Sequence, residues 1–142
     1  MAHWYPDDAA IERVARGMMD HTLAKDAWTH AAHFAACLWL LDQPAEIPLE
    51  ARMPDLIHAY NVAVGGVNSD TAGYHETITL ASIRAARRHR AQAPGPLHES
   101  LDALMDGALG RSDWLLAYWR RETLFSVAAR RTWVDPDLSP LA

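Results

Sequence analysis

The sequence has little of what defines several large classes of protein. Its single cysteine, Cys37, excludes an internal disulfide and suits a reducing compartment. No stretch approaches the ~18 consecutive apolar residues that a bilayer-spanning helix needs. Residues 1–8 also lack the basic region and the apolar run of a secretion signal. These absences predict a cytoplasmic protein without a membrane partner.

Basic charge is scarce as well. The chain carries 13 Lys and Arg residues against 18 Asp and Glu residues, which gives a formal net charge of −5. A protein that binds nucleic acid usually presents a basic face that neutralises phosphates. The composition therefore argues against a nucleic-acid partner.

The remaining composition is that of an ordinary globular protein. Half of the 142 residues are hydrophobic and 22% are charged. A chain of this length buries roughly two-thirds of its unfolded surface within one domain. The sequence shows no strand-like alternation, internal repeat or low-complexity segment. We therefore expect a single helical domain over residues 1–142.

Helix start and stop signals divide the chain into predicted helices. The expected starts are Asp7-Asp8 after Pro6, Asp26 or Thr29, Pro54 in a first turn, the caps Asn68-Ser69-Asp70, Leu97, and Ser112-Asp113. The expected ends are the residue before Pro44, Gly65-Gly66, about Arg90, and Gly110. The tail after Trp133 is expected to be extended and held to the body by Trp133, Val134 and Leu138. The predicted fold is all-α, a compact bundle of five to six helices with an extended C-terminal tail.

Two segments place histidines on the apolar side of helices. The first is Trp28-Thr29-His30-Ala31-Ala32-His33, in a predicted helix with no charged residue between Ala27 and Leu41. The second is Gly73-Tyr74-His75-Glu76-Thr77-Ile78-Thr79. At 100° per residue, His75, Thr79 and Ser82 share one inward strip of the fourth helix. Arg84 and Arg88 lie on the opposite side of that helix.

These buried polar groups need partners, because an unpaired buried imidazole or carboxylate costs a few kcal/mol. One interpretation satisfies the histidines with hydroxyls, backbone carbonyls and each other. The other is a pocket between the second and fourth helices. In that pocket His30, His33 and His75 are candidate ligands of a transition-metal ion. The motifs HExxH, ExxH and CxxC are absent.

The same pocket predicts further roles. His75 and Glu76 are the candidate catalytic residues, with Glu76 as a general base or as a group that orients a histidine. Tyr74, Thr79 and Ser82 are the candidate substrate-binding residues.

Other side chains offer alternatives. Cys37 shares a stripe with His30 and His33, which resembles a thiolate–imidazole set, although a lone cysteine is more often a small core residue. Three arginines, Arg52, Arg121 and Arg130, could clamp a carboxylate or phosphate or could pair with Glu122 and Asp135. The aromatic residues Trp114, Tyr118 and Trp119 exceed what a small core is expected to bury, which would suit a homodimer.

Four motifs carry a resemblance. In order they are Trp28-Thr29-His30-x-x-His33, Tyr74-His75-Glu76-Thr77-x-Thr79, Arg121-Glu122-x-Leu124-Phe125-Ser126, and Pro136-Asp137-Leu138-x-Pro140-Leu141. The set resembles a family of small bacterial all-helical proteins with no agreed function, from about residue 20 to the C-terminus. The resemblance implies one shared architecture and no activity. Tyr118-Trp119-Arg120 stands where the family has a sequence closer to Tyr-Tyr-Ser, so it departs from the pattern.

The leading hypothesis is a small cytoplasmic enzyme that acts on a small organic molecule in a buried, histidine-rich, metal-binding pocket. The alternative is a non-catalytic helical module that binds a small molecule or a protein, in which the histidines are structural.

Overall fold

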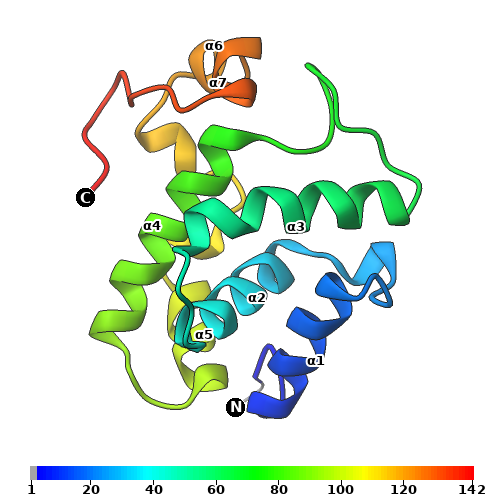
Figure 1. Ribbon diagram of the computed structural model, residues 1–142. Coiled ribbons are helices and arrows are strands. Elements are labelled where there is room, and N and C mark those ends of the chain that lie inside the picture. Colours follow the sequence, from blue (N-terminus) through cyan, green and yellow to red (C-terminus); the bar gives the residue numbers. More distant parts are fainter. Residues whose placement is uncertain (1–2) are drawn as a thin grey trace.

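The computed structural model describes residues 3–142, which form seven α-helices, three short 3₁₀ helices and connecting loops (Figure 1). The α-helices are α1 (Asp8–Met19), α2 (His30–Asp42), α3 (Leu49–Ala63), α4 (Glu76–Gln92), α5 (Leu97–Asp106), α6 (Arg121–Leu124) and α7 (Val127–Arg131). The 3₁₀ helices are η1 (Lys25–Ala27), η2 (Ala108–Gly110) and η3 (Trp114–Ala117). The all-α prediction is confirmed, since no strand occurs in this range. None of these helices has the length and apolarity that a bilayer span requires.

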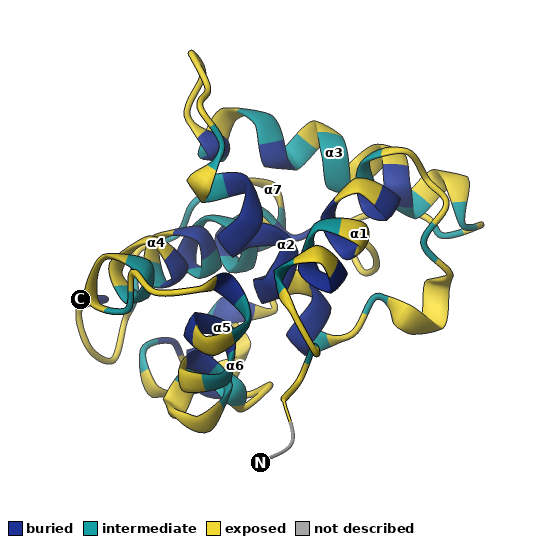
Figure 2. Ribbon diagram, turned by 90° about the horizontal axis from the view of Figure 1, so that it is seen from below, coloured by how far each residue is buried: buried dark blue, intermediate teal, exposed yellow. Residues whose placement is uncertain are grey.

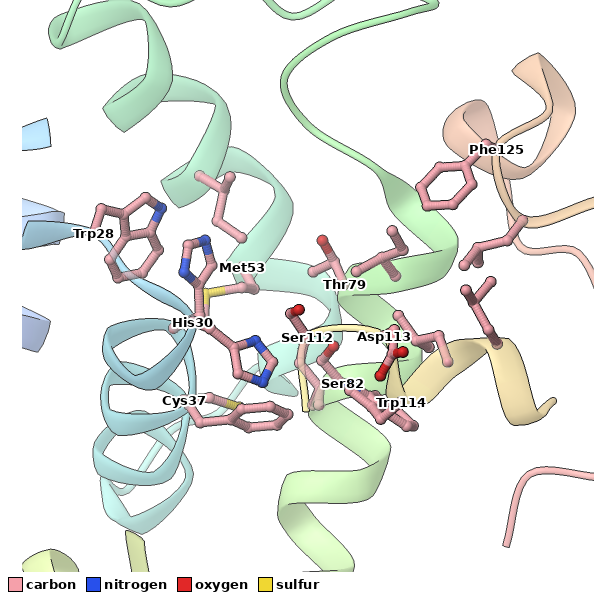
Figure 3. A pocket seen from close by; sticks show the side chains of 18 of the residues that line it. Trp28, His30, Cys37, Met53, Thr79, Ser82, Ser112, Asp113, Trp114 and Phe125 are labelled. Carbon is pink, nitrogen blue, oxygen red and sulfur yellow. The ribbon is translucent and has the colours of Figure 1, made fainter. Parts of the chain in front are cut away.

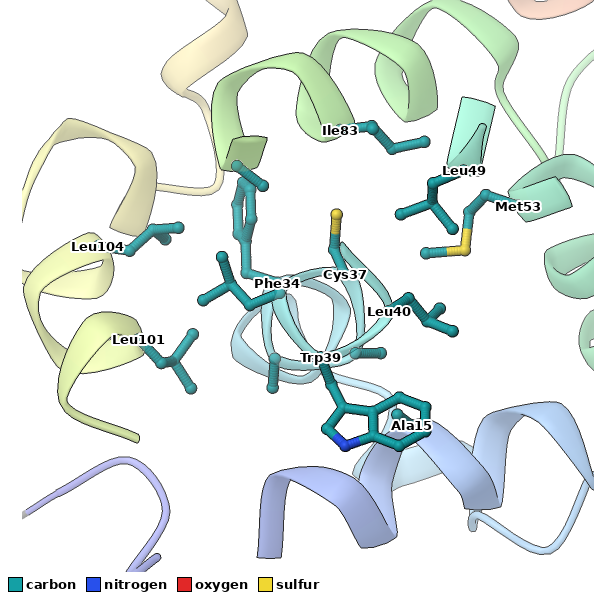
Figure 4. Close-up of a cluster of buried hydrophobic side chains, with 14 of the residues drawn as sticks. Ala15, Phe34, Cys37, Trp39, Leu40, Leu49, Met53, Ile83, Leu101 and Leu104 are labelled. Carbon is teal, nitrogen blue, oxygen red and sulfur yellow. The ribbon is translucent and has the colours of Figure 1, made fainter. Parts of the chain in front are cut away.

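Helix α2 is the centre of the core. It packs against α1, α4 and α5, and its residues 34–40 are all buried (Figure 2). Figure 4 shows side chains radiating from α2 toward Ile83 of α4, Leu101 of α5 and Met53 of α3. Each fully buried aliphatic side chain stabilises the fold by about 1.5–3 kcal/mol relative to exposure. The uncharged sequence of α2 is therefore explained by its position.

The first two helices begin where the sequence predicts. Asp7 caps α1 by accepting a hydrogen bond from the Ala10 N–H at 2.8 Å. Thr29 caps α2 by accepting one from the Ala32 N–H at 3.2 Å. Both interactions are local, so the cap residue and the apolar spacing after it are sufficient to predict the start.

The predicted start of the fourth helix at Asn68-Ser69-Asp70 is wrong. Helix α4 begins at Glu76, and His75 is its cap. The Asn68 side-chain oxygen accepts instead from Asn61 Nδ2 and from the Tyr74 N–H, both at 3.0 Å, which ties the loop to α3. Gly73 keeps this loop tight, because its φ is +81° and a Cβ there would lie 2.2 Å from the Val67 carbonyl oxygen.

Two further boundaries differ from the prediction. Helix α3 begins at Leu49, so Pro54 lies inside the helix and not in its first turn. The predicted sixth helix at Ser112-Asp113 is the 3₁₀ helix η3, followed by the short helices α6 and α7. Of the aromatic residues invoked for a homodimer, Trp114 and Trp119 are buried in the core and Tyr118 is partly buried against it, and the homodimer stays a prediction.

The C-terminal tail lies on the body of the protein, as predicted. The Trp119 indole donates to the Val134 carbonyl at 2.9 Å, and the Leu138 N–H donates to the Tyr118 carbonyl at 2.9 Å. Thr77, fully buried in the first turn of α4, donates to the Thr132 carbonyl at 2.9 Å and accepts from the Val134 N–H at 3.1 Å. The tail therefore supplies partners to the buried polar groups of Thr77 in α4 and of Trp119.

Candidate functional site

A cavity of about 490 Å³ lies between α2, α3, α4 and the segment 112–125. This is the place at which the sequence predicted a pocket, between the second and fourth helices. Most of the lining is apolar, including Trp28, Phe34, Met53, Ile57, Ile83 and Trp114. A volume of this size and an apolar lining are typical of sites that bind small molecules.

A small set of polar side chains also lines this first cavity. They are His30, His33, Thr79, Ser82, Ser112, Asp113 and Arg121. Figure 3 shows His30 on α2 and Ser82 on α4 facing one space, with Ser112 and Asp113 beside them. The inward strip of α4 predicted from helical spacing thus reaches the cavity through Thr79 and Ser82.

His30 uses one of its two ring nitrogens within the protein. Its Nε2 lies 2.8 Å from the Leu109 carbonyl oxygen, so Nε2 carries the proton and donates. The ring also packs edge-on against Phe34, with 5.3 Å between ring centroids. In the neutral imidazole, Nδ1 is therefore an acceptor.

His33 has the complementary arrangement. Its Nδ1 donates to the Thr29 carbonyl at 2.6 Å, and the ring stacks on Trp28 with centroids 3.9 Å apart. Within residues 3–142, His33 Nε2 has no hydrogen-bond partner, so it is an open acceptor. The His33 side chain is exposed where it faces the cavity. The protein packed around the rest of the ring displaces water, and this desolvation lowers the pKa of His33. The neutral, accepting form is thereby favoured.

His75 does not line the first cavity. Its Nε2 donates to the Leu124 carbonyl at 2.6 Å, and its Nδ1 accepts from the Ile78 N–H at 3.1 Å as the cap of α4. Burial lowers the pKa of His75. Both nitrogens are occupied, so this histidine joins α4 to α6 and leaves no lone pair for a metal or substrate.

The geometry does not support the predicted metal centre. His30 and His33 share the first cavity, whereas His75 is bonded elsewhere. In the described range 3–142, no group of three or more His, Cys, Asp or Glu side chains is placed to hold a metal ion. Both ring nitrogens of His75 are used in hydrogen bonds, so only His30 and His33 keep a nitrogen that could ligate an ion.

The other predicted site residues divide between locations. The Tyr74 hydroxyl donates to the Glu76 carboxylate, and burial raises the pKa of this tyrosine. Glu76 lies in a shallow groove with His58 and Arg131, outside the first cavity. Thr79 and Ser82 line the first cavity and remain candidate binding residues, whereas Glu76, bonded to Tyr74, does not line it.

Cys37 is not half of a thiolate–imidazole pair. Its side chain is buried at the cavity, and desolvation raises the pKa of the thiol to about 12. The neutral thiol is a small core group at neutral pH. That alternative from the sequence is wrong.

A second cavity, of about 580 Å³, lies beside the first. Its lining comes from η1, α2, α3, the loop before α4, α4 and α7, and it includes Lys25, Tyr60, Asn61, Tyr74, His75 and Arg130. Sequence reasoning missed this space because the loop before α4 was assigned to a helix. The available signal was Arg130, which the sequence marks as a candidate anion clamp.

The segment 112–125 was missed as a cavity wall for a similar reason. Ser112 and Asp113 have the pattern of a helix start, yet their side chains line the first cavity.

Comparisons with family models, with curated proteins and with solved structures found no match to this chain.

Proposed function

We propose that this protein binds a small, mainly apolar molecule in the first cavity and recognises a hydroxyl or N–H group on it through His33. The observation that carries the proposal is the open Nε2 of His33 at an apolar cavity of about 490 Å³. The Thr29 carbonyl holds the proton on Nδ1, so Nε2 offers its lone pair without any rearrangement. This function follows the small-molecule-binding alternative, except that His33 contacts the ligand instead of being structural, and it needs no metal.

Preorganisation supports the proposal. The ring of His33 is fixed by Trp28 on its face and by Thr29 at its edge, so binding a ligand orders little that is not already ordered. The Thr79 and Ser82 hydroxyls lie on the facing helix and can donate or accept as the ligand requires. A few polar groups in an apolar wall are the usual source of orientation in such sites.

Two fluorescent probes test the proposal: 2-naphthol, which has a hydroxyl donor, and 2-methoxynaphthalene, which lacks it. We expect 2-naphthol to bind more tightly by about 1 kcal/mol, or roughly fivefold in Kd, because only it donates to His33. In His33→Phe this difference should disappear while weak binding of both probes remains.

Cavity occupancy has its own matched variants. Ser82→Leu should fill part of the cavity and weaken both probes at least about tenfold, a loss of about 1.4 kcal/mol. Ser82→Ala keeps the space, and Arg84→Leu adds the same side chain on the exposed face of α4. Arg84→Leu should leave binding unchanged, and Ser82→Ala, which loses only a hydroxyl, should weaken binding far less than Ser82→Leu does. Failure of the wild-type protein to bind either naphthalene, or equal binding by Ser82→Leu, would overturn the proposed function.

A further inference from the structure

The two cavities share a wall. Trp28, His33, Ile57, Ile78 and Thr79 line both of them. These side chains therefore form the boundary between the two spaces. His33 and Thr79 bring an open acceptor nitrogen and a hydroxyl to this boundary.

The second cavity differs from the first in charge. Lys25 and Arg130 line it, and no Asp or Glu belongs to its described lining. This is unusual for a chain whose net charge is −5. A cationic space without carboxylates favours an anion over a neutral or basic group.

Neither cation is neutralised by an ion pair within residues 3–142. Arg130 Nη1 donates to the Gly73 and Tyr74 carbonyls at 3.0 and 3.2 Å, which fixes the guanidinium against the loop. Its other nitrogens remain donors. Lys25 is exposed on η1 and lines the same cavity. An anion bound in this cavity would accept hydrogen bonds from the fixed guanidinium of Arg130 and from the flexible ammonium group of Lys25.

We propose that the ligand is a small amphipathic acid: an apolar body in the first cavity, a hydrogen-bond donor at His33, and an anionic group between Lys25 and Arg130 in the second cavity. This inference rests on the proposed function, because it places the apolar part of the ligand in the first cavity. It adds a chemical class, since a neutral ligand would leave both cations without a counter-ion.

The test extends the naphthalene probes. We compare 2-naphthylglycolate, whose hydroxyl lies between the naphthalene ring and the carboxylate, with its methyl ester, which has nearly the same shape and no charge, by calorimetric titration. The carboxylate is expected to bind about tenfold more tightly than the ester at low salt. Its affinity should fall as sodium chloride rises, while that of the ester should not.

Lys25→Met is the deciding variant, because the exposed Lys25 side chain forms no ion pair within the described residues and its loss should not disturb the fold. It should remove most of the advantage of the carboxylate and leave 2-naphthol unchanged. Arg88→Met is the matched control, since Arg88 is exposed on α4 and lines neither cavity. It should behave as wild type.

The outcomes separate the two proposals. If 2-naphthol binds but the carboxylate gains nothing over its ester, or Lys25→Met keeps the gain, the acid-binding inference is overturned and the proposed function stands. If no naphthalene binds, the proposed function falls and this inference falls with it.

Discussion

The two histidine segments look alike in sequence and differ in what their ring nitrogens do. Both lie at the start of a helix, α2 in one case and α4 in the other. Both ring nitrogens of His75 form hydrogen bonds with the backbone, whereas His30 and His33 each use only one nitrogen in this way. A buried histidine with two bonds is a structural connector, and a histidine with one bond beside a cavity is available to a ligand. The number of open nitrogens therefore distinguishes the two segments better than burial does.

The largest expected effect comes from removing the connector. His75→Ala should lower the free energy of unfolding by about 2–4 kcal/mol, because it removes the cap of α4 and leaves the Leu124 carbonyl unpaired. Chemical denaturation followed by circular dichroism measures this. His33→Ala is the matched variant on α2 and should cost clearly less. Equal losses would erase the distinction drawn between the segments.

Two threonines near the start of α4, Thr77 and Thr79, point to different sides of the helix and sharpen the comparison at a second pair of sites. Thr77→Val should destabilise by about 1–3 kcal/mol, since it orphans the Val134 N–H and the Thr132 carbonyl. Thr79→Val keeps the shape but changes only the wall of the cavities, so its effect on stability should be small. Urea denaturation of both variants provides the measurement. A larger loss at Thr79 would contradict the assignment of Thr79 to ligand contact.

Acid should destabilise the protein through both segments. The pKa values of His33 and His75 are lowered by desolvation, so the unfolded chain binds protons more readily than the folded one. Their contribution is present above the ordinary value of 6.5 and is lost as the pH falls through the folded values. Urea denaturation between pH 7.5 and pH 5 should show this decline, and it should be weaker in His33→Phe. A decline of the same size in that variant would remove His33 from this account.

The smallest expected effect has the opposite sign. His98 bonds to the Asp8 carboxylate, which raises the pKa of His98. Its stabilising contribution is fully present below pH 6.5 and is lost as the pH rises through the folded value. His98→Gln should therefore differ most from wild type at pH 5.5 and hardly at all at pH 8.5. A titration of the ring protons by NMR would show the raised pKa directly.

The sequence predicts best what depends on neighbouring residues. The caps Asp7 and Thr29 and the apolar surface of α2 follow from spacing alone, as does the inward position of Thr79 and Ser82. The carbonyl that fixes His33 is also local, since Thr29 lies four residues earlier on the same helix. Because this carbonyl is within reach of His33 on the same turn, its bond to Nδ1 could have been predicted, and Nε2 would then have been identified as the open nitrogen.

The features that the sequence did not predict depend on hydrogen bonds between residues far apart in the chain. The partner of His30 is 79 residues away, and the partner of His75 is 49 residues away, so helical spacing gives no sign of either. The start of α4 was misplaced because Asn68 bonds to Asn61 and Tyr74 instead of capping a helix. The second cavity depends on the loop that this bonding creates, and it could not be predicted without that loop.

The dependence of α4 on the tail has a consequence for synthesis on the ribosome. The carbonyl that pairs with Thr77 belongs to a residue added 55 positions later. At about 5–20 residues per second, that interval lasts several seconds. Until then Thr77 and the Trp119 indole lack their hydrogen-bond partners, which are backbone groups of residues 132–134. A nascent chain halted before residue 132 would therefore hold its early helices while this end remained open to proteases and chaperones.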